Sequence, residues 1–191
     1  ALHNKQQLSG YSKPDHPIQI ELVRLIGELG QVDLSRTAKG IDGCGIPVFG
    51  IPINAVALAM ANVADPHYLP ELRTEAVKRI VESYSQNPIM ISGTNKINSL
   101  IQAETSEKAI VKGGAEGVYT AAVKSLGLGI CLKIDDGAAR AASNTMLSIL
   151  EMLGVLDAKS IQRIAERGFS DVQNWSGHLV GRIRSSSGLA F

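Results

Sequence analysis

The stretch that decides the fold is AIVKGGAEGVYTAAVKSLGLGICLKID, residues 109–135. It divides into three extended segments, AIVKG, GVYTAAV and GICLKID, and the glycine-rich or Ser-Leu-Gly turns between them are short enough for hairpins. In the last segment Ile130, Leu132 and Ile134 alternate with a cysteine, a lysine and an aspartate, which predicts one buried face. The stretch therefore predicts a three-stranded antiparallel meander.

Helical patterns lie on both sides of this meander. The expected helices cover residues 17–30, 54–64, 70–88 and, more briefly, 94–103 before it, and residues 138–154 and 157–168 after it. Residues 40–52 are rich in glycine and proline and predict turns with short extended pieces, and a further strand is expected near residues 178–184. The order predicts an α+β fold in which an antiparallel sheet is packed by helices.

Two of the expected helices are amphipathic. On the first, a proline at its start and Gly30 at its end mark the boundaries. Its apolar face comprises Ile18, Leu22, Leu25, Ile26 and Leu29. On the helix over residues 70–88 the residues expected to face inward are Leu72, Ala76 and Ile80, with Tyr84 or Val81.

The composition excludes several classes of protein. Of the 191 residues, 45% are hydrophobic and 19% charged, and the net charge is +1, so the chain is not basic enough to indicate nucleic-acid binding. No apolar run is long enough to span a bilayer, and the first ten residues lack the apolar middle of a signal peptide. Two cysteines make no disulfide framework. We expect one cytoplasmic domain over residues 1–191, with no nucleic-acid or membrane partner.

The most informative short motif is Lys112-Gly113-Gly114. It is not a phosphate-binding P-loop, because the four-residue spacer and the hydroxyl residue after the lysine are missing and a strand follows where a helix should begin. A lysine at a strand edge followed by glycines is compatible with a substrate lying along that edge. The alternative is an edge-strand lysine beside a bulge, and the residues alone leave both open.

Three other groups have a chemical and a structural interpretation. Asp42 and Cys44 place two possible metal donors in one glycine turn, but two donors do not make a zinc site and a lone cysteine is more often a buried thiol. His16, beside an aspartate, stands where a helix cap belongs and favours capping over a catalytic dyad. Asp136 is expected to cap the helix that follows and to reach Arg140 at i+4.

Four segments together resemble a known family. In order and spacing, GYSKPDHPIQ, GIDGCGIPVFGIPINAVALAMA, IVKGGAEGVYTAAV and GLGICLKIDDGAARA are similar to the thermolabile, Rhizobium-type bacterial L-asparaginases. The resemblance runs from about residue 8 to the C-terminus. The Asp-Gly-Cys-Gly and Lys-Gly-Gly-Ala-Glu-Gly elements are specific to that family.

The resemblance implies an amidohydrolase that converts L-asparagine to L-aspartate and ammonia, on a fold like that of serine β-lactamases and penicillin-binding proteins. It implies a homodimer and a zinc ion beside the catalytic serines. Carried onto this sequence, it makes Lys112 a catalytic residue that stabilises developing charge or tunes the serine. It assigns Gly113, Gly114 and Glu116 to substrate binding. It makes Cys44 a zinc ligand and Asp42 a ligand or an orienting group.

Two family elements, Ser-x-x-Lys and Cys-Ser-Gly-Lys, do not occur in the 191 residues. We therefore expect the chain to be the C-terminal portion of a longer asparaginase-like domain, incomplete at the N-terminus, with the serine nucleophile outside it. The alternatives are another β-lactamase-like serine acyl-transferase or a non-catalytic zinc-holding domain. Gly113 argues against the first, because a hydroxyl residue is usual at the middle of a Lys-x-Gly element.

Overall fold

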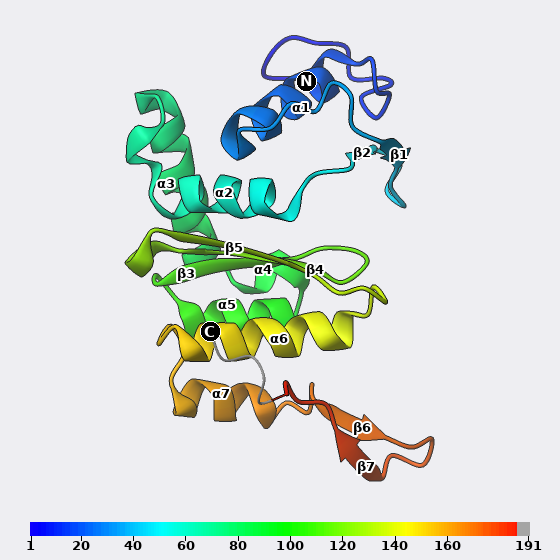
Figure 1. The fold of residues 1–191 in the computed structure, drawn as a ribbon, viewed down its shortest axis with the longest axis vertical. Helices are drawn as coiled ribbons and strands as arrows, with labels where there is room; N and C mark the ends of the chain where they lie inside the picture. The colour runs from blue at the N-terminus through cyan, green and yellow to red at the C-terminus, as the bar shows by residue number, and fades with distance from the viewer. Residues whose placement is uncertain (187–191) are drawn as a thin grey trace. The chain divides into compact units, whose positions relative to one another are not determined.

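The structure is a computed structural model that describes residues 1–186 and divides into two compact units, residues 1–59 and from residue 60 onward (Figure 1). The units are groupings of contacts within one chain, and a single domain over residues 1–191 stays a prediction. Among residues 1–186, no helix is both long and apolar enough to cross a membrane.

The first unit contains α1 (Pro17–Gly30), the hairpin of β1 (Lys39–Ile41) and β2 (Pro47–Phe49), and the start of α2 (Ile53–Ala64). His16 is the N-cap of α1: its Nδ1 accepts the backbone N–H of Ile18 at 3.2 Å, and its Nε2 lies 2.7 Å from the carbonyl oxygen of Gln7. The cap satisfies one of the free N–H groups of the first turn. The prediction that His16 caps a helix is confirmed.

The end of α1 differs from the expectation. Gln31, rather than a glycine, adopts the left-handed conformation after the helix, with φ of 49°. Gly30 serves close packing instead, because a Cβ there would lie 2.8 Å from the carbonyl oxygen of Ala55. Leu22 and Ile26 of the predicted apolar face remain exposed.

The second unit carries the predicted meander. Its elements are η1 (Pro66–Tyr68), α3 (Glu71–Gln86), α4 (Ile89–Ser92), α5 (Ile97–Thr105), β3 (Ala109–Gly113), β4 (Val118–Val123), η2 (Lys124–Leu126), β5 (Leu128–Lys133), α6 (Ala139–Met152), α7 (Ala158–Ala165), β6 (Asp171–Gln173) and β7 (Leu179–Arg182). The sheet order β3-β4-β5 is antiparallel throughout. An α+β architecture with small antiparallel sheets is confirmed. The strand expected near residue 180 is β7, which pairs with the unforeseen β6.

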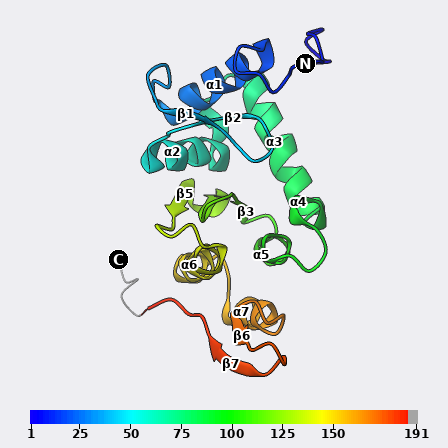
Figure 2. The same ribbon diagram turned by 90° about the vertical axis from the view of Figure 1, so that its right-hand side faces the viewer.

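The two faces of the meander are covered by different helices. Helices α5 and α6 lie side by side against one face and α7 lies beyond them, as both views show (Figures 1 and 2). That face carries the larger core, which includes Val111, Tyr119 and Met146, all at most 2% exposed. On the opposite face Ile110 and Ala122 pack with residues from the end of α2 and from α3.

The inward face of α3 agrees with the sequence analysis at Val81 and Tyr84 but not at Leu72 and Ile80. Leu72 and Ile80 are exposed at 86% and 52%, whereas Val77 and Val81 pack into the core of the opposite sheet face with Tyr84. Two apolar stripes run along this helix, about one residue position apart. Residues 77 and 81 are four positions apart, as are residues 72 and 76, so helical periodicity alone does not distinguish the two stripes. The stripe that becomes buried is the one that packs against the surface around Ile110 of β3. The sequence of α3 carries no information about that surface.

Candidate functional site

Lys112 occupies the penultimate position of β3 and is exposed. It stands opposite Thr120 of β4, which in turn stands opposite Cys131 of β5, so the three residues form a row across one face of the sheet. Residue 110, two positions earlier, packs on the α3 side, so Lys112 projects from that same face. Its Nζ donates to the carbonyl oxygen of Gly113 at 2.5 Å. The lysine is therefore held at the end of the strand with its amine accessible.

The outer edge of β3 is closed along part of its length by a side chain. Within the described sheet β3 has a strand on one side only, and its odd-numbered residues direct their backbone groups away from β4. The fully buried amide of Gln102 takes the place of a neighbouring strand. Its Oε1 accepts the N–H of Val111 at 2.9 Å, and its Nε2 donates to the carbonyl oxygen of Ala109 at 3.0 Å. Gly113 lies beyond the two backbone groups that Gln102 binds, so the accessible part of the β3 edge begins next to Lys112.

The two glycines of the motif allow close packing as well as an open edge. A Cβ on Gly113 would lie 2.8 Å from Nδ2 and 2.9 Å from Oδ1 of Asn98, a residue of α5. A Cβ on Gly114 would lie 3.2 Å from the Cβ of Val118, across the hairpin. The space beside Gly113 on the α5 side is therefore occupied by an amide. Asn98 and Gln102 were both missed by sequence reasoning, because no spacing rule links a helix to the strand it packs against.

Glu116 lies in the turn between β3 and β4, with a positive φ of 55°, and is followed by Gly117 with φ of 69°. Its carboxylate reaches over the turn that precedes α6: a Cβ on Gly137 would lie 2.8 Å from Glu116 Oε2. The N–H of Ile134 donates to the carbonyl oxygen of Gly117 at 3.1 Å, which ties the two turns together. Glu116 is exposed, so it presents a free carboxylate four positions after Lys112.

Asp42 and Cys44 belong to the first unit, in the loop between β1 and β2. The N–H of Asp42 donates to the carbonyl oxygen of Ile46 at 2.9 Å, and the Sγ of Cys44 donates to Asp42 Oδ2 at 3.3 Å. Cys44 is exposed, so the interpretation as a buried core thiol is wrong. The two donors do converge on one another. In residues 1–186 no group of three or more histidine, cysteine, aspartate or glutamate side chains could hold a metal ion, and Asp42 and Cys44 alone are two of the four donors that a structural zinc site requires.

The pairing of Asp136 with Arg140 before α6 is confirmed, but Asp136 is not the cap of that helix, because the N-cap is Ala138 and no side chain caps it. Asp136 Oδ1 accepts the N–H of Ala138 at 2.8 Å, and Arg140 Nη2 donates to Asp136 Oδ2 at 2.9 Å. The backbone N–H, and then the nearby Arg140, lower the pKa of Asp136, which keeps it an anion and an acceptor. Both oxygens of this carboxylate therefore accept hydrogen bonds from residues at the start of α6.

The row that contains Lys112 offers no reactive thiol or hydroxyl. Burial raises the pKa of Cys131, so its thiol stays protonated and is a poor nucleophile. The hydroxyl of Thr120 donates to the carbonyl oxygen of Lys112 at 3.2 Å and is occupied in the sheet. The arrangement can supply a positive charge and an open strand edge to a reacting carbonyl, but the attacking atom has to come from another element.

Comparison with known proteins identifies a family for the chain. The family model described as L-asparaginase II matches residues 1–185, almost the whole chain. No curated protein gives a significant match. The matched region includes the β1–β2 loop with Asp42 and Cys44 and the β3–β4 hairpin with Lys112. The chain therefore belongs to the L-asparaginase II family.

Proposed function

We propose that this protein hydrolyses L-asparagine to L-aspartate and ammonia. The observation that carries the proposal is the family match over residues 1–185. The position of Lys112 supports it, because an exposed lysine at an open strand edge is suited to a substrate that carries an amide and a carboxylate.

In the proposed reaction a serine hydroxyl from outside the 191 residues attacks the side-chain amide carbon of asparagine. The serine loses its proton to a base, the C–N bond breaks as the nitrogen takes up a proton, and ammonia leaves. A water molecule then hydrolyses the resulting ester and releases aspartate. Lys112 would hold its positive charge next to the oxygen that becomes negative in each step. The backbone edge at Gly113 and Gly114 would lie alongside the substrate, and Glu116 would face its ammonium group.

Several finer features belong to the same proposal. We infer a β-lactamase-like fold of the thermolabile, Rhizobium type, of which this chain forms the C-terminal portion, and a cytoplasmic homodimer. The antiparallel meander with helices on both faces is compatible with that fold. Asp42 and Cys44 would hold zinc together with ligands from elsewhere. Zinc would add a Lewis acid beside the site, and the steps above depend on the serine and on Lys112.

Ammonia release from L-asparagine by the full-length protein tests the reaction, and a Lys112→Ala variant tests the lysine. We expect the rate constant for turnover to fall by about 100-fold or more while KM changes less, because the lysine acts on charge that develops in the transition state. Lys159→Ala is the matched control, since Lys159 is also exposed but lies on α7. Full turnover by Lys112→Ala would remove the lysine from the mechanism. Hydrolysis of a chromogenic β-lactam without ammonia release from asparagine would reassign the substrate.

A further inference from the structure

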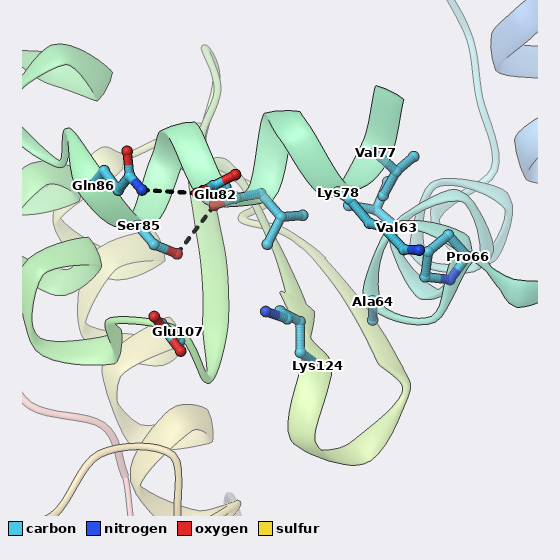
Figure 3. A pocket seen from close by; sticks show the side chains of 11 residues that line it. Val63, Ala64, Pro66, Val77, Lys78, Glu82, Ser85, Gln86, Glu107 and Lys124 are labelled. Carbon is cyan, nitrogen blue, oxygen red and sulfur yellow. Dashed lines mark hydrogen bonds between the residues drawn. The ribbon is translucent and has the colours of Figure 1, made fainter. Parts of the chain in front are cut away.

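A cavity of about 290 Å³ lies within the second unit, away from Lys112. Its walls come from the end of α2, from α3, from the residues just before β3 and from η2 (Figure 3). Lys124 of this cavity follows the end of β4, whereas Lys112 stands opposite Thr120. Four residues of strand separate Thr120 from Lys124, roughly 13 Å at the usual rise. The cavity is therefore distinct from the candidate site.

One part of the cavity is aliphatic. It is lined by Val63, Ala64, Val77 and Val81, which belong to the core on the α3 side of the sheet, and the side chain of Lys78 lies beside Val63 and Val77. Val81 is only 4% exposed, so this wall is a continuation of the packed interior. An aliphatic group placed there would remove both its own surface and the valine surface from water, which favours binding.

The other part of the cavity carries charges of both signs. Lys124 and Glu107 are exposed, and among residues 1–186 neither has a salt-bridge partner within 4.0 Å. The carboxylate of Glu82 accepts a hydrogen bond from Gln86 through Oε1 at 2.9 Å. Figure 3 shows Glu82 and Glu107 on the side of the cavity away from Val63 and Val77, and Lys124 lies between the acidic side and the valine side.

This cavity wall is held by hydrogen bonds rather than by loose side chains. The hydroxyl of Ser85 donates to the carbonyl oxygens of Val81 at 3.0 Å and of Ser106 at 3.2 Å, which joins α3 to the turn before β3. The N–H of Lys124 donates to the carbonyl oxygen of Lys108 at 2.8 Å, which joins η2 to the same turn. Glu107 and Lys124 are therefore carried on backbone segments that are fixed to one another.

We propose that this cavity binds a free α-amino acid with an aliphatic side chain. The ammonium group of such a ligand pairs with Glu107, its carboxylate pairs with Lys124, and its side chain lies on the valines. A volume just below the usual range of about 300–1,000 Å³ suits a ligand of this size rather than a larger cofactor. The inference does not depend on asparagine hydrolysis, because it uses none of the candidate site residues.

Calorimetric titration of the full-length protein with L-leucine tests the proposal, with two analogues that each lack one charge. These are 4-methylpentanoate, which lacks the ammonium group, and 3-methylbutylamine, which lacks the carboxylate. We expect saturable binding of leucine and at least tenfold weaker binding of both analogues, since charge-assisted hydrogen bonds are among the stronger polar contacts. Equal binding of either analogue overturns the amino-acid assignment, and absence of leucine binding overturns the site.

Variants locate the bound amino acid. Lys124→Met and Glu107→Gln each remove a charge while keeping most of the side chain, and each is expected to weaken leucine binding about tenfold. Lys159→Met and Glu75→Gln are matched controls on exposed helix positions and are expected to bind leucine normally. Lys112→Met is expected to retain leucine binding. If instead Lys112→Met abolishes binding and Lys124→Met does not, leucine occupies the candidate active site and the proposed cavity is wrong.

Discussion

Replacement of Gln102 by methionine should destabilise the protein by about 2–4 kcal/mol. Gln102 is fully buried, and its amide makes one hydrogen bond to the N–H of Val111 and one to the carbonyl oxygen of Ala109. Methionine fills a similar volume but makes neither bond. A typical hydrogen bond contributes about 1 kcal/mol net, and a buried group left without a partner costs about 1–3 kcal/mol.

The two bonds do not cost the same. The carbonyl oxygen of Ala109 also accepts from the hydroxyl of Thr105 at 3.1 Å, so it keeps a partner in the variant. The N–H of Val111 points away from β4, and residues 1–186 offer it no second acceptor within hydrogen-bonding distance. Most of the lost free energy of unfolding therefore comes from the unpaired N–H of Val111. The total is expected to be about 2–4 kcal/mol, which is less than if both backbone groups lost their hydrogen-bond partners.

Thermal unfolding and hydrogen exchange together test this reasoning. For a chain of this length, the loss corresponds to a melting temperature lower by roughly 4–15 °C. The amide of Val111 should exchange faster relative to the amides of β4, which keep their partners. Gln162→Met is the control, because Gln162 is exposed and its side-chain amide donates to the side chain of Glu166 on the same helix surface. A loss below about 1 kcal/mol, or unchanged protection of Val111, would refute the role of Gln102 as a substitute for a neighbouring strand.

Three further predictions concern single contacts. Gly113→Ala should lower stability by about 1–2 kcal/mol in the native background but become neutral or stabilising when combined with Asn98→Ala, because the clash is with that amide. His16→Ala should cost about 1 kcal/mol through loss of the α1 cap, and His16→Asn should restore most of it in urea unfolding. Glu104→Gln should cost about 0.5–1 kcal/mol at neutral pH, because Glu104 accepts two hydrogen bonds from Arg163. Since Arg163 lowers the pKa of Glu104, this difference should disappear as the pH falls through that lowered value.

Each of these three has an internal comparison. Gly181→Ala is the control for Gly113→Ala, because among residues 1–186 no atom beyond the two chain neighbours lies within 4 Å of a Cβ at Gly181. If Gly113→Ala is equally destabilising with and without Asn98, backbone conformation rather than that contact explains the loss. A His16→Asn variant no better than His16→Ala would contradict capping. Persistence of the Glu104→Gln effect at pH 2 would show that it does not arise from the carboxylate charge.

The elements of the fold were predictable wherever the periodicity of the sequence was itself sufficient. The alternation after residue 109 and the glycine turns predict β3, β4 and β5 within about two residues, and Pro17 marks the start of α1. The orientation of α3 was not predictable in this way. Its two apolar stripes are equivalent in sequence, and the choice of Val77 and Val81 depends on Ile110, a residue of a distant strand.

The candidate site shows the same division. Lys112 was identified from its motif, because a lysine before two glycines at a strand end is a local feature. Asn98 and Gln102 were not, because an amide in a helix has no local mark that it will meet the backbone of β3. A side chain that hydrogen-bonds the free backbone groups of an edge strand can be recognised only when the positions of both the helix and the strand are known.

The two hydrogen bonds from Gln102 to the β3 backbone also explain how this short strand can belong both to the core and to the candidate site. An edge strand with free backbone groups is prone to pair with other chains, and proteins usually cover such an edge along its length. Here a single buried amide covers the edge at Ala109 and Val111, and the cover ends before Gly113. The first part of β3 is therefore held against the core, while the strand edge at its last residue, Gly113, stays accessible beside Lys112. The proposed function therefore predicts that a variant that loosens Gln102 lowers the turnover of asparagine by more than the loss of folded protein explains, because the edge beside Lys112 is displaced.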